Sequence, residues 1–203
     1  MRVENPRLIF NKKIIFIDRD GVINKDPGGW TPHSYVTRWD QFHFLPGAKE
    51  AIKRLNDKGY SIVVVSNQAG ISKGFYSQDE LGKINKMMLD ELKKSGGKIE
   101  KTYYCLHQDS DNCDCRKPAI GLFKRAQKEL KAKIEGAYFI GDGKMDVEAG
   151  KKANLKTILL LSGKSNLDHI EEWIIRPDYI FKDLLEAVNF ILKPRAKSRD
   201  KRR

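Results

Sequence analysis

The chain has 203 residues, of which 40% are hydrophobic and 33% charged, a balance that is typical of one globular domain and excludes fibrous and disordered classes. No apolar run approaches the roughly 20 residues that a membrane-spanning helix requires. Residues 1–10 also lack the apolar centre of a secretion signal. We therefore expect a monomeric cytoplasmic protein with no membrane partner.

The formal net charge of +12 is unevenly distributed. Residues 193–203 contain seven Lys or Arg and one Asp, a net charge of +6 and half of the whole excess. Because this segment has little apolar surface to bury, we predict a domain over residues 1–192 followed by a solvated, mobile tail. A tail that binds polyanions is the alternative, and it leaves nucleic acid open as a partner.

Predicted strands and helices alternate along the chain. Apolar, β-branched runs typical of strands occur at 13–18, 60–66, 102–105, 137–141, 156–161 and 178–181. Apolar residues near a 3.6-residue period predict helices at about 47–58, 78–94, 119–131, 146–153 and 183–192. This alternation predicts an α/β fold with a Rossmann-like, three-layer arrangement, in which helices cover both faces of a parallel sheet.

Two segments do not fit this alternation. Residues 21–45 form a long, turn-rich connection, and such length is typical of a functional flap. Residues 105–117 contain all three cysteines of the chain.

Polar side chains follow the predicted strands, at the sheet edge where α/β proteins bind ligands. They are Asp18, Asp20, Ser66, Lys117, Asp142 and Asp146. Singly, each carboxylate could be a turn former or a helix cap. Together, carboxylates that repel one another require a cation among them, and oxygen ligands favour Mg²⁺. A nucleophilic carboxylate, a second carboxyl kept protonated by its environment and an amine are also the components of phosphoryl transfer.

These residues resemble the motifs of the haloacid dehalogenase (HAD) superfamily of phosphatases. Asp18-Arg-Asp-Gly-Val22 resembles the first motif, Ser66 the second, Lys117 the third and Gly141-Asp142-x-x-x-Asp146 the fourth. The resemblance covers about residues 13–163, in the order of the family. One departure is Val22, where the family more often has Thr or Ser.

The resemblance implies a role for each motif residue. Asp18 would be the nucleophile and Asp20 the general acid and base, and Ser66 and Lys117 would hold the transferring phosphoryl group. Mg²⁺ would be bound by Asp18, the backbone carbonyl of Asp20 and Asp142. Asp146 would support the metal or orient Lys117.

Three thiols and one imidazole lie close together in the sequence, as Cys105-x-His107 and Cys113-x-Cys115. This donor set matches a closed tetrahedral zinc site. A disulfide and unrelated buried thiols are the alternatives, and the odd number of cysteines and the Cys-x-Cys spacing argue against the disulfide. Because four protein ligands leave no position for water, we predict a structural zinc loop at 105–115 that fixes the adjacent Arg116-Lys117.

The zinc loop resembles that of a HAD branch without a large cap, which contains heptose-bisphosphate 7-phosphatases and histidinol-phosphate phosphatases. Residues 66–76 resemble the heptose members, whereas the short gap between His107 and Cys113 resembles the histidinol members. Gly143 departs from the Lys that heptose members often carry there. We expect a heptose bisphosphate as substrate, with histidinol phosphate or another sugar or polyol phosphate as alternatives and nucleic-acid 3′-phosphates as the rival class. The resemblance implies substrate contacts from Asp26, Pro27, Gly28, Gly29, Asn67, Gln68, Ala69 and Arg116.

Overall fold

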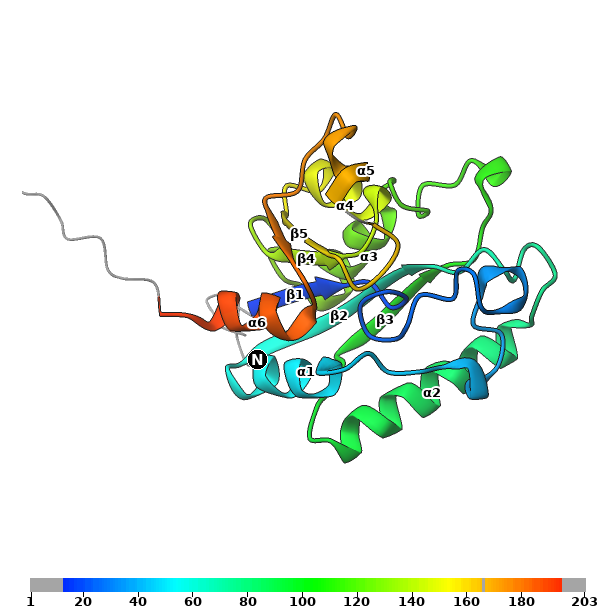
Figure 1. Cartoon of the computed structure of the whole chain (residues 1–203), viewed down its shortest axis with the longest axis horizontal. Helices are drawn as coiled ribbons and strands as arrows, with labels where there is room; N and C mark the ends of the chain where they lie inside the picture. Colours follow the sequence, from blue (N-terminus) through cyan, green and yellow to red (C-terminus); the bar gives the residue numbers. More distant parts are fainter. Residues whose placement is uncertain (1–12, 166, 195–203) are drawn as a thin grey trace, which may run out of the picture.

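The computed structural model describes residues 13–165 and 167–194, so most of the predicted basic tail lies outside the described residues. One sheet of parallel strands runs through this part of the chain in the order β3-β2-β1-β4-β5-β6 (Figure 1). The strands are β1 (Lys13–Ile17), β2 (Tyr60–Asn67), β3 (Lys101–Cys105), β4 (Tyr138–Gly141), β5 (Lys156–Leu160) and β6 (Tyr179–Phe181). The structure therefore confirms the predicted α/β fold.

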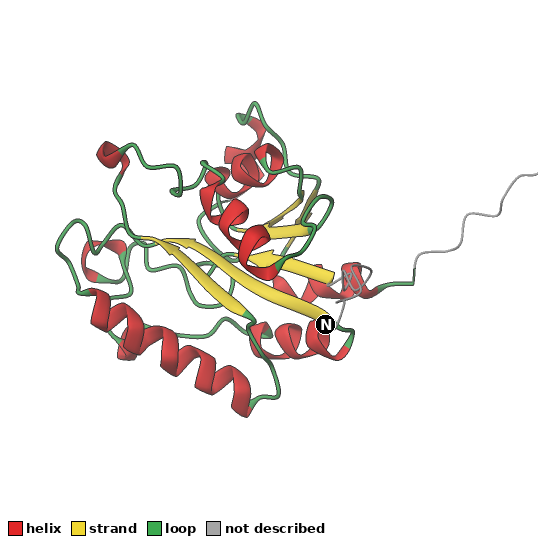
Figure 2. Cartoon of the chain, turned by 180° about the vertical axis from the view of Figure 1, so that it is seen from behind, coloured by secondary structure: helices red, strands yellow, loops and turns green. Residues whose placement is uncertain are grey.

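Helices cover both faces of this sheet (Figure 2). They are α1 (Ala48–Asp57), α2 (Gln78–Lys94), α3 (Gly121–Leu130), α4 (Lys144–Lys152), α5 (Leu167–Glu171) and α6 (Leu184–Leu192). Helices α1, α2 and α6 pack on one face, and α3 and α4 on the other. The sequence did not predict the short helix α5, which spans five residues.

The central strand β1 contributes to both hydrophobic cores because successive side chains of a strand point to opposite faces. Ile15 and Ile17 join the core beneath α1, α2 and α6. Ile14 and Phe16 join the core beneath α3 and α4. Burial on both faces explains why β1 is almost uniformly apolar.

The flap at 21–45 packs onto the same core as α1 and α2. Val36 and Phe42 are buried there, and the indole of Trp39 stacks on Phe42 with ring centroids 5.0 Å apart. Phe42 also meets Phe44 edge to face at 5.0 Å. These aromatic side chains anchor the flap to the rest of the domain. No large cap domain interrupts the part of the chain that the structure describes.

None of the described helices is long and apolar enough to cross a bilayer.

Candidate active site and metal centres

The predicted catalytic side chains meet in one cavity of about 370 Å³ beyond the carboxyl ends of β1, β2 and β4. Its lining includes all six residues that the sequence placed at the strand ends: Asp18, Asp20, Ser66, Lys117, Asp142 and Asp146. They meet because β1 lies between β2 and β4 in the sheet, so the ends of these three parallel strands are neighbours.

Lys117 lies at the centre of this group. Its Nζ is 2.7 Å from Asp18 Oδ2 and 2.6 Å from Asp146 Oδ1, and it donates to the carbonyl of Val65 at 3.0 Å. Burial alone would lower the pKa of Lys117, but the carboxylates of Asp146 and Asp18 raise it above its ordinary value. Lys117 is therefore a fixed cation beside Asp18.

The backbone of Lys117 is fixed by the side chain of Asn67. Asn67 Oδ1 accepts from the Lys117 N–H at 3.0 Å, and Asn67 Nδ2 donates to the Lys117 carbonyl at 3.1 Å. The peptide bond from Lys117 to Pro118 is cis. Asn67 lines the cavity, but its side-chain amide is occupied by holding Lys117 in place.

A carboxylate cluster is the candidate site for a divalent cation. Oxygens of Asp18, Asp142 and Asp146 lie within 4.8 Å of one another. Burial raises the pKa of Asp142 well above its ordinary value, and the neighbouring Asp146 and Asp18 raise it further. Because three buried carboxylates repel one another, this donor set of hard oxygens fits a hard cation such as Mg²⁺.

Asp146 supports this cluster rather than facing the cavity with a free oxygen. Its Oδ2 accepts from the backbone N–H of Gly143 at 3.0 Å and from that of Asp142 at 3.2 Å, and its Oδ1 pairs with Lys117. Both oxygens are thereby engaged, which agrees with a role in orienting Lys117 and the turn that carries Asp142.

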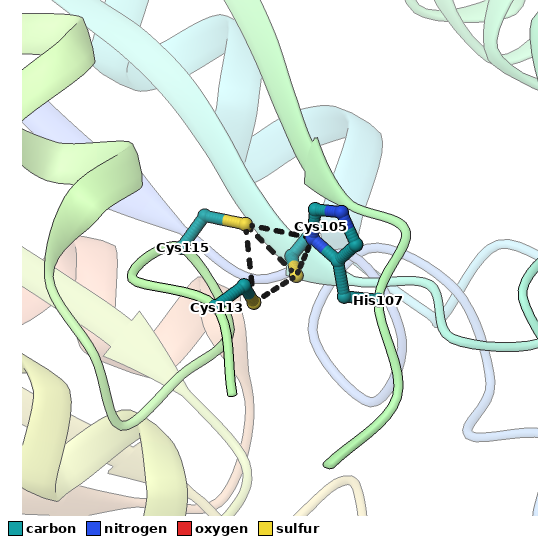
Figure 3. Close-up of side chains that lie close together, drawn as sticks. All are labelled: Cys105, His107, Cys113 and Cys115. Carbon is teal, nitrogen blue, oxygen red and sulfur yellow. Dashed lines mark hydrogen bonds between the residues drawn. The ribbon is translucent and has the colours of Figure 1, made fainter. Parts of the chain in front are cut away.

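The second candidate metal centre is formed by Cys105, His107, Cys113 and Cys115 (Figure 3). The sulfur of Cys115 lies 3.2 Å from that of Cys105 and 3.4 Å from that of Cys113, and Cys105 and Cys113 are 3.6 Å apart. His107 Nδ1 completes the group, 3.3 Å from the sulfur of Cys115. A tetrahedron with zinc–sulfur bonds of about 2.3 Å has edges of about 3.8 Å, close to these separations. All three cysteines are free thiols, so the alternative of a disulfide is not realised.

Comparison with known proteins identifies the family. A HAD-hydrolase-like family model matches residues 114–187. A D-glycero-beta-D-manno-heptose-1,7-bisphosphate 7-phosphatase of Haemophilus ducreyi is 34% identical over 188 residues, which cover 89% of this chain and 98% of the relative. The Pasteurella multocida protein of the same name is 39% identical over 75% of this chain and 84% of its own length. The chain belongs to the HAD phosphatases. It is a hydrolase of phosphoric monoesters in the family of these relatives.

A solved structure supports this assignment. The D,D-heptose 1,7-bisphosphate phosphatase from B. bronchiseptica, crystallised with magnesium and phosphate, superposes with a TM-score of 0.80 at 27% identity. The match covers 89% of this chain and 98% of that chain. The two proteins thus share their fold over nearly the full length of the relative.

Asp20 of this phosphatase is held by several donors. Its carboxylate accepts from the guanidinium of Arg19 at 3.0 Å, and from the amides of Asn24 and Gln68 at 2.8 Å each. Burial alone would raise the pKa of Asp20, but the charge of Arg19 and these hydrogen bonds lower it below its ordinary value. The sequence-based expectation that the surroundings keep Asp20 protonated was therefore wrong for this structure, because Arg19 lies against the carboxylate.

The side chains that the resemblance assigned to the substrate occupy different environments. Gln68 and Ala69 are fully buried, behind the cavity rather than on its wall. Arg116 lies at the zinc loop, where it forms an ion pair with Asp109 at 2.6 Å and lines a separate cavity of about 540 Å³.

Residues 26–29 do not line the catalytic cavity, but their turn approaches one lining residue through Asp26. Asp26 Oδ1 accepts from the N–H of Gly28 at 2.8 Å. Asp26 Oδ2 is 3.6 Å from the Nζ of Lys164, which does line the cavity. Pro27 and Gly29 belong to this turn, and the Pro27 carbonyl accepts from the hydroxyl of Thr31 at 2.8 Å.

The cavity has a further wall that was not predicted from the sequence. This wall consists of Lys144, Met145, Lys164, Ser165 and Trp173. Lys164 also donates its backbone N–H to Asp142 Oδ2 at 2.9 Å, which helps to orient that carboxylate. Trp173 packs against Val147 and Leu159. The only local signal for this wall is the turn Ser162-Gly-Lys-Ser165 after β5, at the same sheet edge as the other motifs.

Gly163 packs so closely against the side chain of Asp142 that a larger residue does not fit there. A Cβ at this position would lie 2.1 Å from Asp142 Oδ2. We expect Gly163→Ala to displace the carboxylate and to lower kcat/KM by about 100-fold, the loss typical of a displacement of about 1 Å. Steady-state kinetics with saturating Mg²⁺ measures the effect.

Gly82→Ala is the matched control, since a Cβ on this exposed residue of α2 meets no atom within 4 Å. It should leave kcat/KM unchanged and raise the free energy of unfolding by roughly 0.5–1 kcal/mol. If Gly163→Ala keeps wild-type kinetics, the close packing of this turn against Asp142 does not matter for catalysis.

Proposed function

We propose that this chain is a magnesium-dependent phosphatase that removes the 7-phosphate of D-glycero-D-manno-heptose 1,7-bisphosphate, through an aspartyl-phosphate on Asp18. The observation that carries the proposal is the placement of Lys117, which pairs with the nucleophile Asp18 inside a cavity that also contains Ser66 and the carboxylate cluster. The names of the relatives support the substrate.

In the first step, an oxygen of Asp18 attacks phosphorus while the bond from phosphorus to the substrate oxygen breaks. Asp20 gives a proton to that leaving oxygen. Lys117 and the hydroxyl of Ser66 bind the oxygens of the phosphoryl group as it moves. The arrival of the substrate's negative charge beside Asp20 favours the protonated form of its carboxyl, which the ligand-free surroundings do not.

In the second step, water attacks the aspartyl-phosphate and Asp20 takes up the proton of that water, which regenerates Asp18 and releases phosphate. The residues that would hold Mg²⁺ are Asp18, Asp142 and the backbone carbonyl of Asp20. When bound, the ion supplies positive charge that offsets the charge on the phosphoryl oxygens.

We also propose that the Cys105–Cys115 loop holds a structural zinc ion. The donor set and its spacing support this proposal. The zinc would hold Lys117 in position rather than take part in the reaction, because Arg116 and Lys117 follow Cys115 directly. We keep as proposed substrate contacts the turn at 26–29, Asn67 and Arg116. We also propose that the protein is monomeric and cytoplasmic.

A comparison of substrates tests the proposed function. We expect kcat/KM for one anomer of heptose 1,7-bisphosphate to exceed that for histidinol phosphate and for a 3′-phosphorylated oligonucleotide by at least about 100-fold. Histidinol phosphate lacks the second phosphate that the site would bind, and an oligonucleotide carries its other phosphates as diesters in different positions. Phosphate release is measured with both anomers, since relatives carry the alpha and the beta designation.

Equal low rates on all three substrates would contradict the heptose assignment. A preference for the oligonucleotide that falls steeply with salt would instead favour the nucleic-acid class. A variant that ends at residue 192 is the control, because it lacks the basic segment without altering the cavity.

A further inference from the structure

A buried polar network lies behind the catalytic cavity and consists of Arg19, Asp20, Gln68 and Tyr76. Arg19 has no exposed surface, and its guanidinium contacts Asp20 through Nε at 3.2 Å and Nη2 at 3.0 Å. Nη2 also donates to Gln68 Oε1 at 3.0 Å. Because a buried ion pair stabilises a fold poorly compared with apolar packing, the presence of this pair beside Asp20 points to a role other than stability.

The orientation of the Gln68 amide follows from its donors. Oε1 accepts from the Tyr76 hydroxyl at 2.7 Å and from Arg19. Arg19 can only donate, so the amide oxygen and not the amide nitrogen must face it, and Nε2 faces the opposite way. There it donates to Asp20 Oδ2 at 2.8 Å and lies 3.2 Å from Ser66 Oγ.

Gln68 thus joins the two groups that face the two ends of the breaking bond. In the proposed mechanism, Asp20 protonates the leaving oxygen, and Ser66 binds the phosphoryl oxygens. The side chain of Gln68 is itself fully buried and does not line the cavity. Its hydrogen bonds therefore reach the reaction only through Asp20 and Ser66.

We propose that Gln68 is a positioning residue for Asp20, and that Tyr76 and Arg19 act by fixing its amide. The proposal rests on the proposed function, in which Asp20 protonates the leaving oxygen. Gln68 holds one oxygen of Asp20 toward that position. Arg19 keeps the amide from turning over because it cannot accept a hydrogen bond, and Tyr76 adds a second hydrogen bond to Oε1. Gln68, which the resemblance placed among the substrate contacts, would thus orient the general acid instead.

Dependence on the leaving group separates this role from a merely structural one. Phenyl phosphate and 4-nitrophenyl phosphate are similar in size and carry no sugar hydroxyls, but phenolate needs a proton on departure more than nitrophenolate does. A displaced Asp20 should therefore slow phenyl phosphate more. We expect the ratio of kcat/KM for nitrophenyl to phenyl phosphate to rise by about tenfold in Gln68→Met and by about threefold in Tyr76→Phe, within the range of general acid catalysis.

Tyr103→Phe is the matched control for Tyr76→Phe. Tyr103 is also buried, but its hydroxyl bonds to Glu129 on α3, on the other face of the sheet. Its ratio should stay within about twofold of the wild-type value, since it has no contact with the general acid.

Asp20→Asn provides the reference for loss of the acid. In that background Gln68→Met should change the ratio no further, because both substitutions act on one group. A fall of equal size on both esters, or a further rise of the ratio in the Asp20→Asn background, would overturn the positioning role while leaving the proposed function intact. If the wild-type enzyme hydrolyses neither ester nor heptose bisphosphate, the proposed function itself fails, and the positioning role with it.

Discussion

Replacing Asp18 by Asn is expected to lower kcat by at least about 10⁴-fold, the order of loss that follows removal of a covalent nucleophile. An amide cannot attack phosphorus, and it also removes the negative partner of Lys117, whose Nζ lies 2.7 Å from Asp18 Oδ2. Phosphate release under saturating Mg²⁺ measures the loss. Rapid acid quenching followed by mass measurement should detect a phosphorylated wild-type protein and no phosphorylated variant.

Asp90→Asn is the matched control for this substitution. Asp90 lies on the exposed side of α2 and pairs with Lys86 at 2.7 Å. An exposed pair of this kind contributes less than about 1 kcal/mol, so activity and stability should be close to wild type. If Asp18→Asn hydrolyses phosphate esters as fast as Asp90→Asn, the proposed aspartyl-phosphate mechanism is wrong.

Removing the proposed zinc ion is expected to lower both stability and activity. The loop that contains the four donors leads from Cys115 directly to Lys117, and the Asp114 carbonyl accepts from the N–H of Gly121 at 2.8 Å, at the start of α3. Loss of the ion would release this loop and with it the cation beside Asp18. We expect kcat to fall by about 10- to 100-fold, as for other changes that loosen the support of a site.

The same treatment should lower the Tm by roughly 5–10 °C, since about 2–4 °C corresponds to 1 kcal/mol in a protein of this size and a released metal loop loses a few kcal/mol. Chelation followed by addition of Mg²⁺ alone, compared with Mg²⁺ plus Zn²⁺, separates the two metal sites. Only the second addition should restore kcat and Tm.

Cys113→Ser should reproduce the loss irreversibly, and Ser110→Ala in the same loop is its control, because the exposed side chain of Ser110 is not one of the four donors. Metal analysis of protein purified without chelator should find about one zinc per chain. The absence of zinc, together with unchanged kinetics of Cys113→Ser, would contradict a metal centre at this loop.

The sequence by itself determined the fold and grouped the carboxylates, the hydroxyl and the amine that meet in the catalytic cavity. Apolar runs followed by amphipathic stretches predicted the parallel sheet, and the predicted strands agree closely with β1 to β6. Once the sheet is parallel, the residues that follow the strands meet at one edge whatever the details of packing, which is why Asp18, Ser66 and Asp142 could be grouped in advance. The four zinc-loop donors could be grouped because they are close in sequence.

Only the tertiary structure decided what the side chains around these motifs contact. Asn67 and Gln68 looked alike as substrate residues, yet one clamps the backbone of Lys117 and the other faces Asp20 from behind the cavity. The protonation of Asp20 also depended on how the buried Arg19 turns toward it. Such contacts join residues from different loops, so the direction of each side chain depends on partners that no local pattern encodes.

The wall formed by Lys164 and Trp173 shows the same limit. Neither residue belongs to a periodic pattern, and Trp173 reaches the cavity only because it packs on Val147 and Leu159, which come from two other elements. The pattern of strands and helices thus sufficed to group the polar side chains of the cavity, and the resemblance to the HAD motifs implied the roles of Asp18 and Lys117. How the acid is held and what surrounds the substrate were decided by packing between distant segments.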